Sequence, residues 1–159
     1  MKHRVALTVN GRVHELDIES HRTLLEVIRD ELKLFGARES CGTALCGACT
    51  VLIDGAPISS CTYLAARANG RSITTVEGLA GPDGLHPVQK AFLQEGAFQC
   101  SYCTPGMLLS TVALLEENPS PTVEEIKDYL VGNLCRCGSY PQIIQAVLAA
   151  AAVHRQAPR

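Results

Sequence analysis

The sequence is poor in the features that mark several common protein classes. It has no tryptophan, 4% aromatic residues and a formal net charge of only −2. A protein that binds nucleic acid normally presents a basic face, and one that attracts basic partners over a distance is strongly acidic. The near-neutral charge therefore argues against nucleic acid as a partner and against long-range electrostatic steering.

Two targeting features are also missing. No run of about 18 apolar residues occurs, so we expect no membrane-spanning helix. The first residues, MKHRVALTVNGRVHELDI, alternate and then become polar, unlike the roughly 7–15-residue apolar core of a signal peptide. We therefore expect a cytoplasmic protein, although a partner with its own twin-arginine signal could carry a folded complex to the periplasm.

Motifs for substrate chemistry are absent as well. No G-x-G-x-x-G follows an expected strand, and neither a P-loop nor a nucleophile elbow occurs. The histidines are scattered, and none is adjacent to a group of cysteines: His3, His14, His21, His86 and His154. A Rieske cluster, in contrast, needs paired histidines near its cysteines. We expect a chain that has no catalytic residues or substrate site of its own.

Cysteine is abundant, with eight in the chain. In a reducing compartment, thiols are more often metal ligands or catalytic groups than disulfide partners. The first four follow the pattern C-x4-C-x2-C-x11-C and are Cys41, Cys46, Cys49 and Cys61. This is the plant-type ferredoxin spacing for a 2Fe–2S cluster. Gly42 and Gly47 would let the loop curl closely around an inorganic core. A four-cysteine zinc site, the alternative, usually pairs two C-x2-C knuckles.

The other four cysteines form a C-x2-C pair and a C-x-C pair: Cys100, Cys103, Cys135 and Cys137. By itself this spacing fits a zinc site or a cluster. Each pair is followed by an expected helix start, at Thr104-Pro105 and at Tyr140-Pro141, so two helix N-termini would face a thiolate-rich anion. A 2Fe–2S cluster is anionic and larger than a zinc ion, and both properties favour the cluster.

Residues 1–76 show a mixed strand and helix pattern. Two hairpins are expected, with turns at Asn10-Gly11 and Asp54-Gly55. Between them, Thr23 and Glu26 form a capping box that predicts a helix start. A short helix from about Thr62 and a last strand over residues 72–76 complete this part. The pattern predicts a compact mixed sheet around one helix.

The rest of the chain is expected to be helical. Residues 77–86 are rich in glycine and proline and are predicted to form a linker. Residues 87–159 then contain four expected helices, over 87–95, after Thr104 as N-cap, after a capping box at Thr122, and over 141–153. The chain is therefore predicted to have an α+β first domain and an all-helical second domain.

The segments around the cysteines are distinctive. They read ESCGTALCGACTVLIDGAPISSC, ITTVEGLA, AFQCSYCTPGML and NLCRCGSYPQIIQAV. These runs closely resemble the iron–sulfur (small) subunit of the molybdenum hydroxylases, the family of xanthine dehydrogenase, aldehyde oxidase and carbon monoxide dehydrogenase. The resemblance extends over residues 5–153. It implies an N-terminal β-grasp ferredoxin domain and a C-terminal four-helix bundle, each with one 2Fe–2S cluster.

The resemblance also implies roles and partners. The cluster of the helical domain would lie nearest the molybdopterin of a large catalytic subunit. The cluster of the ferredoxin domain would lie toward a flavin (FAD) subunit, or a cytochrome or other acceptor in its place. Gln99 and Cys137 match positions that approach the pterin in relatives. The chain would be the electron-transfer subunit of an oxidoreductase that forms a hetero-oligomer, such as a dimer of heterotrimers.

Two positions depart from the family pattern. Ser101 stands where many relatives have glycine, and Gly138-Ser139 stands where they have Thr-Gly; none of these residues is an expected ligand. The form CGSYP resembles the isoquinoline oxidoreductase and bacterial aldehyde dehydrogenase branches, some of which lack a flavin subunit. Two alternatives remain at this point: a free-standing two-cluster electron carrier and a zinc-stabilised interaction module.

Overall fold

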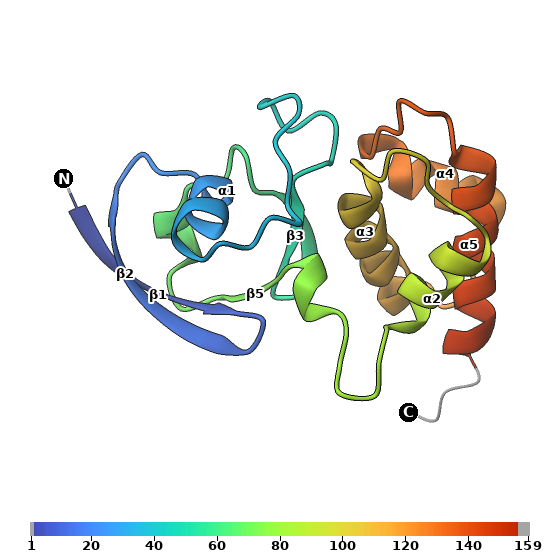
Figure 1. The fold of residues 1–159 in the computed structure, drawn as a ribbon, viewed down its shortest axis with the longest axis horizontal. Coiled ribbons are helices and arrows are strands. Elements are labelled where there is room, and N and C mark those ends of the chain that lie inside the picture. Colours follow the sequence, from blue (N-terminus) through green and yellow to red (C-terminus); the bar gives the residue numbers. More distant parts are fainter. Residues whose placement is uncertain (1, 156–159) are drawn as a thin grey trace.

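A computed structural model describes residues 2–155 of the chain, so residues 1 and 156–159 of the expected domains lie outside the described residues. Five strands form one sheet in the order β2-β1-β5-β3-β4, and helices α2 to α5 gather on one side of it (Figure 1). The strands are β1 (Lys2–Val9), β2 (Arg12–Glu19), β3 (Thr50–Ile53), β4 (Ala56–Ser59) and β5 (Ser72–Thr74). The fold is thus a mixed α+β structure.

Both expected hairpins are confirmed. β1 and β2 pair around Asn10-Gly11, whose φ values are 50° and 77°. β3 and β4 pair around Asp54-Gly55, with φ values of 50° and 86°. Positive φ at both central residues defines a turn whose twist matches the flanking strands. β5 runs parallel to β1 and antiparallel to β3 and so joins the two hairpins into one sheet.

The first helix begins where its capping box predicts. Helix α1 (Leu24–Glu26) continues into a π-helical turn, η1 (Val27–Glu31). The Thr23 hydroxyl accepts a hydrogen bond from the Glu26 N–H at 3.2 Å, and the Glu26 carboxylate accepts from the Thr23 N–H at 2.7 Å. Four apolar side chains of this segment are buried against the sheet: Leu24, Leu25, Val27 and Ile28.

The short helix expected from about Thr62 starts only at Ala65, as the 3-10 turn η2 (Ala65–Ala68). The residues before it are held extended by pairing with the start of α1. The Leu24 N–H donates to the Tyr63 carbonyl at 2.7 Å, and Leu64 forms a β-bridge with Thr23. The last strand is also shorter than expected, because a 3-10 turn, η3 (Val76–Gly78), follows it.

Helices occur at all four positions expected in the second part. They are α2 (Pro87–Gln94), α3 (Thr104–Glu117), α4 (Val123–Tyr129), which ends in the 3-10 turn η4 (Leu130–Gly132), and α5 (Tyr140–His154). The prediction of Thr104 as N-cap is wrong by one residue. Cys103 occupies the cap and already has helical φ and ψ values of −82° and −15°, so Thr104 lies inside the helix.

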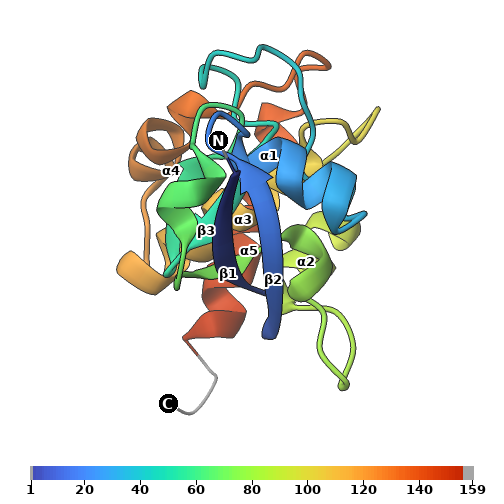
Figure 2. The same ribbon diagram turned by 90° about the vertical axis from the view of Figure 1, so that its left-hand side faces the viewer.

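Two hydrophobic cores stabilise the chain. One lies between the sheet and α1, and the other lies among α2, α3, α4 and α5. A smaller contact joins them, where Leu52 of β3 packs against Leu109 and Ala113 of α3. Viewed from the sheet side, β1 and β2 lie in front of α3 and α5 (Figure 2). The two halves therefore meet along β3 and α3.

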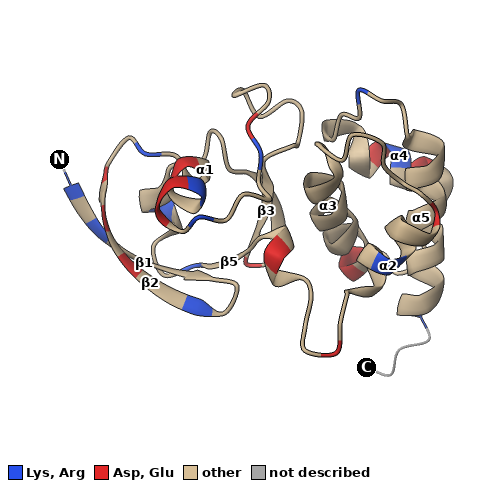
Figure 3. Ribbon diagram, in the orientation of Figure 1, with Lys and Arg blue, Asp and Glu red and all other residues tan. Residues whose placement is uncertain are grey.

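Charged residues are unevenly distributed (Figure 3). The β1–β2 hairpin and the first helix carry many of them, whereas α5 has none and α3 has only two glutamates at its C-terminal end. This is consistent with the central position of α3, most of which is buried. Among residues 2–155, no helix has the length and apolar character needed to cross a membrane.

Candidate metal centres

The first cysteine group lies at one end of the sheet. Cys41 is exposed, Cys46 and Cys49 are buried, and Cys61 is partly buried. Cys49 directly precedes β3, and Cys61 follows β4 after one residue, so the hairpin returns the chain to its starting point. Between them, the buried Ser60 donates to the Cys49 carbonyl from its hydroxyl at 2.6 Å and from its N–H at 3.3 Å. The sheet thus places the fourth cysteine beside the loop.

This loop is tightly curled. Gly42, Ala44 and Gly47 all have left-handed backbone conformations, with φ values of 66°, 62° and 69°. The need for glycine flexibility at Gly42 and Gly47 is confirmed. At Gly47 a second constraint comes from the other half of the chain, because a Cβ atom there would lie 2.4 Å from Asn133 Nδ2 and 2.5 Å from the Gly132 carbonyl oxygen. Only glycine permits this approach.

The chain that leads into the loop is fixed from both sides. The Arg29 guanidinium donates to the carbonyls of Ala37 at 2.7 Å and Phe35 at 3.3 Å, and it lies 5.4 Å from the centre of the Phe35 ring. One residue further on, the Arg38 N–H donates to the Ala48 carbonyl at 3.0 Å. The start of the loop is therefore bonded to its end.

The second cysteine group lies at the N-terminal ends of two helices. Cys103 caps α3, and Cys135 and Cys137 come just before Ser139, the N-cap of α5. Helix α5 begins one residue earlier than expected, at Tyr140. Two connecting residues have left-handed conformations: Ser101, with φ 61°, and Gly138, with φ 78°. Ser101 stands where the family pattern has glycine, and its left-handed backbone conformation is one that favours glycine.

The sulfur atoms of the first group interact in pairs. The pKa of Cys41 is lowered to about 6, first by the side chain and N–H of Thr43, and further by the Cys46 thiol. Burial raises the pKa of Cys61 to about 11, and the neighbouring Cys49 thiol raises it further. The Cys41 thiol therefore interacts with that of Cys46, and the Cys61 thiol interacts with that of Cys49 and more weakly with that of Cys41.

The second group has the same arrangement. Burial raises the pKa of Cys103 to about 12, and the Cys135 thiol raises it further. The pKa of Cys100 is lowered by the N–H of Tyr102 and then by the Cys137 thiol. The structure thus associates Cys103 with Cys135 and Cys100 with Cys137.

Each group supplies as many thiols as a 2Fe–2S cluster requires. Such a cluster is held by four cysteine thiolates, and the pKa shifts show that thiols within each group lie close enough to interact. The residues present therefore fit the cluster that their spacing predicts.

Hydrogen-bond donors are also available beside the second group. Burial alone would raise the pKa of Cys135, but hydrogen bonds, first from the Ser139 N–H, lower it on balance. The Thr104 hydroxyl is buried and has no partner in hydrogen-bonding geometry among the described residues, and the Ser139 hydroxyl lies close enough to Cys135 to help lower its pKa. Both lie at helix N-termini next to cysteines, where a cluster offers sulfur acceptors.

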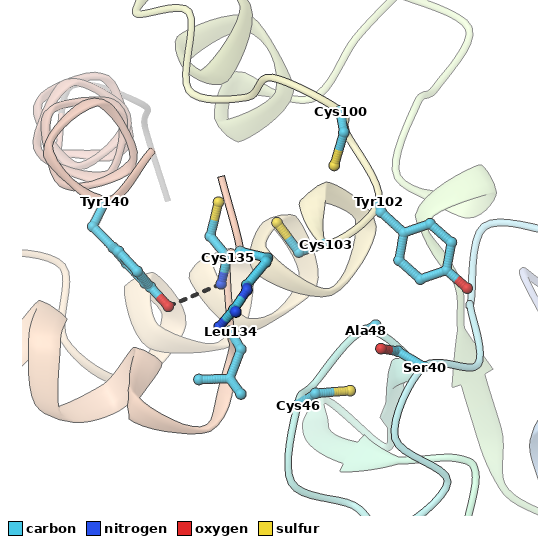
Figure 4. A pocket seen from close by; sticks show the side chains of 10 residues that line it. Ser40, Cys46, Ala48, Cys100, Tyr102, Cys103, Leu134, Cys135 and Tyr140 are labelled. Atoms are coloured by element: carbon cyan, nitrogen blue, oxygen red, sulfur yellow. Dashed lines mark hydrogen bonds between the residues drawn. The ribbon is translucent and has the colours of Figure 1, made fainter. Parts of the chain in front are cut away.

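The two cysteine groups line one pocket of about 400 Å³ (Figure 4). Cys46 comes from the first group and lies across the pocket from three cysteines of the second, Cys100, Cys103 and Cys135. The Leu134 N–H donates to the Cys46 carbonyl at 2.9 Å. One hydrogen bond therefore connects Cys46, a predicted ligand of the first group, to Leu134, which directly precedes Cys135 of the second group.

Gln99 and Cys137, which the family resemblance associates with the pterin, are neighbours in the structure. The Gln99 side-chain amide donates to the Cys137 carbonyl at 3.3 Å, and the side chain is exposed. Gln99 is thus bonded to the backbone of the second cysteine group at the surface of the chain.

Sequence reasoning missed several residues that support the site. The Tyr140 hydroxyl accepts from the Cys135 N–H at 2.8 Å, and the Asn133 amide donates to the Gly47 carbonyl at 3.4 Å. Arg38 and Tyr102 connect the two cysteine loops. The only hint in the sequence that these residues support the site was that they lie near the cysteine motifs. Nearness in the sequence does not reveal a contact between segments that are far apart along the chain.

Comparisons with known proteins agree with this site. Residues 7–93 match the family described as "2Fe-2S iron-sulfur cluster binding domain", and residues 75–148 match the "[2Fe-2S] binding domain" family. The nicotine 6-hydroxylase small subunit of Paenarthrobacter nicotinovorans is 48% identical over 145 residues, which cover 91% of this chain and 87% of that protein. The chain belongs to the family of iron–sulfur subunits of molybdenum hydroxylases. The resemblance seen in the cysteine motifs is thereby confirmed.

Other members of this iron–sulfur subunit family are similar over most of the chain. The nicotinate dehydrogenase small FeS subunit of Eubacterium barkeri is 43% identical over 143 residues, covering 90% of this chain and 91% of that protein. The structure of quinoline 2-oxidoreductase from Pseudomonas putida 86 contains a chain with a TM-score of 0.93 and 40% identity, covering 98% of this chain and 97% of that one. The fold is therefore shared with a chain of a solved structure over almost the whole length.

Proposed function

We propose that this chain is the electron-transfer subunit of a molybdenum-containing hydroxylase or dehydrogenase. It relays electrons one at a time from the molybdopterin centre of a large subunit to a flavin subunit or another acceptor. When bound, each 2Fe–2S cluster supplies one-electron chemistry. The observation that carries the proposal is the pocket lined by cysteines of both groups.

The contacts across this pocket suit a relay. Electronic coupling falls steeply with distance, so two redox sites must be held close together to exchange electrons. Here Cys46 and Cys135 are separated by one hydrogen bond, from the Leu134 N–H to the Cys46 carbonyl, and one peptide unit. This short connection supports electron transfer between the two sites.

Each cysteine group holds one cluster in this proposal. The cluster distant from molybdenum is held by Cys41, Cys46, Cys49 and Cys61. The cluster near molybdenum is held by Cys100, Cys103, Cys135 and Cys137. Gln99, which is exposed and bonded to the Cys137 carbonyl, lies with that carbonyl next to the molybdopterin of the partner subunit.

The proposed domains follow the two hydrophobic cores. Residues 1–76 form a β-grasp ferredoxin domain, residues 77–86 a linker, and residues 87–159 a four-helix bundle domain. The proposed linker is not featureless, because it continues the turn η3 and contains a β-bridge between Gly81 and Gly84. We propose that the complete assembly is cytoplasmic and that its substrate site belongs to the large subunit.

The surface near the cysteines supports an obligate partner. Several large apolar side chains there are exposed, including Leu45 at 71%, Leu134 at 54% and Val131 at 78%. Leu45 lies in the first cysteine loop, and Leu134 precedes Cys135. Exposed apolar groups near functional sites are typical of surfaces that a partner covers, which favours a subunit over a free-standing carrier.

The proposal is tested by purifying the chain together with the proteins that bind it. We expect a large molybdopterin-containing chain to co-purify, and about four irons and four acid-labile sulfides per chain, since two 2Fe–2S clusters are proposed. A stable 17.0 kDa monomer that transfers electrons without partners would instead establish a free-standing carrier. A colourless protein with zinc and no labile sulfide would establish a zinc-stabilised module.

A further inference from the structure

Two residues beside the first cysteine group contact two residues within the second. The Arg38 guanidinium donates to the Ser101 carbonyl at 2.5 Å and lies 5.3 Å from the centre of the Tyr102 ring. In return, the Tyr102 hydroxyl donates to the Glu39 carbonyl. Each loop therefore gives one side chain to the backbone of the other, and we call Arg38 and Tyr102 together the clasp.

The clasp lies only a few residues or hydrogen bonds away from both sets of predicted ligands. The Arg38 N–H donates to the Ala48 carbonyl at 3.0 Å, and Ala48 lies between Cys46 and Cys49. Ser101 and Tyr102 are the two residues between Cys100 and Cys103. Tyr102 extends from its loop towards the segment that carries Ser40 (Figure 4).

The geometry of Ser101 fits this arrangement. Its left-handed φ of 61° determines the direction of its carbonyl, which accepts the hydrogen bond from Arg38. The guanidinium is only partly exposed, so this charge-assisted hydrogen bond is less weakened by water than one on an open surface. Arginine supplies a planar group that donates and stacks at the same time, which lysine does not.

A second set of contacts joins the same two halves elsewhere at the pocket. There, Asn133 and Leu134 donate to the carbonyls of Gly47 and Cys46 at 3.4 and 2.9 Å. The packing of Leu52 against Leu109 and Ala113 already joins the two halves. The two sets of hydrogen bonds, one through residues 133–134 and one through the clasp, add restraints at the cysteine loops themselves.

We propose that Arg38 and Tyr102 are positioning residues that set the separation and coupling of the two cluster sites. The inference rests on the proposed function, since it requires that each cysteine group holds a cluster. Beyond that function, the inference says that the distance and orientation between the two cluster sites depend on two side chains that are not cluster ligands.

Electron paramagnetic resonance of the fully reduced complex tests the clasp. Two reduced 2Fe–2S clusters are both paramagnetic, and their magnetic interaction splits each signal by an amount that falls with the cube of their separation. We expect Arg38→Gln to narrow this splitting while both signals keep their full intensity. Tyr102→Phe should narrow the splitting less, because it removes one of the two reciprocal hydrogen bonds. Arg38→Lys should recover part of the splitting.

One control variant removes a similar group from the other edge of the sheet. Arg12→Gln changes an exposed arginine of β2 that has no side-chain hydrogen bond or ion pair among residues 2–155. This variant should keep the splitting of the unmodified complex.

The outcomes separate the clasp from the proposed function. If the unmodified complex shows two split signals and Arg38→Gln and Tyr102→Phe leave them unchanged, the clasp is rejected and the electron-transfer function stands. If the Arg38→Gln protein does not load clusters, the splitting in Tyr102→Phe is used instead: a narrower splitting supports the clasp, and an unchanged one rejects it. An unmodified complex without two cluster signals rejects the proposed function and the clasp together.

Discussion

Gly106 shows how a single residue controls the approach of the two halves. It lies in the first turn of α3, and a Cβ atom on it would lie 2.0 Å from the Gly47 carbonyl oxygen. The Gly47 carbonyl accepts hydrogen bonds from Thr50 and Asn133 and cannot move without breaking them. Helix α3 therefore contacts the first cysteine loop through backbone atoms, which only glycine allows.

We expect Gly106→Ala to push α3 away from the first cysteine loop. Overpacking at such a contact typically costs about 1–3 kcal/mol, so the free energy of unfolding should fall by this amount. Thermal or denaturant unfolding, with iron and sulfide content measured in parallel, checks the prediction.

Gly132→Ala is the matched control, because a Cβ atom there would meet nothing within 4 Å. At a position with ordinary backbone angles, alanine in place of glycine is neutral or stabilising by about 0.4–1 kcal/mol. Equal effects of the two substitutions would show that the contact between Gly106 and Gly47 does not limit the fold.

Helix termini determine where the elements begin. The capping boxes at Thr23 and Thr122 were predicted from the sequence and are both present. A third box was missed, because its N-cap is His86. The His86 Nδ1 atom accepts from the Val88 N–H at 3.2 Å, and the Gln89 side chain accepts from the His86 N–H at 2.9 Å. Histidine is not a usual cap, so no pattern in the sequence indicated this box.

This cap should make stability depend on pH. Burial lowers the pKa of His86 below its usual value of about 6.5, the Glu116 carboxylate opposes the shift, and His154 adds to it. The unfolded chain then binds a proton more readily than the folded chain. The contribution of His86 is present above about pH 6.5 and is lost as the pH falls below that value.

We expect His86→Asn to weaken this pH dependence, because asparagine caps a helix and does not titrate. Melting temperatures of both proteins between about pH 7 and pH 5 measure the effect, and the unmodified protein should lose stability more steeply. Replacement by alanine, as a second variant, should cost about 1 kcal/mol at neutral pH through loss of the cap. Parallel pH profiles for the unmodified protein and His86→Asn would contradict the prediction.

On the scale of the whole molecule, the two halves bring two separate metal centres to one place. Neither half contains the pocket by itself, since Cys46 comes from the first and Cys100, Cys103 and Cys135 come from the second. The proposed ligands of each centre nevertheless lie within one half. We therefore expect the two centres to be assembled independently and to act in series.

Loss of one ligand from each group tests this order. Cys49→Ser should abolish the spectroscopic signal of the first group and turnover with the outer acceptor. It should leave turnover with an artificial acceptor that takes electrons closer to molybdenum. Cys103→Ser should abolish electron flow to every outer acceptor but preserve the signal of the first group. Equal loss with all acceptors, or loss of both signals in either variant, would contradict the proposed order.

Much of the local structure could be predicted because it depends on short segments. The turns at Asn10-Gly11 and Asp54-Gly55 follow from residues that tolerate positive φ, and two helix starts follow from capping boxes. The short helix near Thr62 began later than predicted because pairing with α1 holds residues 63 and 64 extended. The prediction used only the helix propensity of the local segment, which carries no information about this contact with α1.

By itself, the sequence determined the two cysteine groups, the local elements around them and the family, because ligand spacing, turn residues and caps act over a few positions. Only the tertiary structure decided that both groups line one pocket, that Gly47 and Gly106 touch, and that Arg38 reaches Ser101. These contacts join residues that are dozens of positions apart, and they form where β3 packs against α3. No local pattern encodes the distance between two segments that meet only when the whole chain has folded.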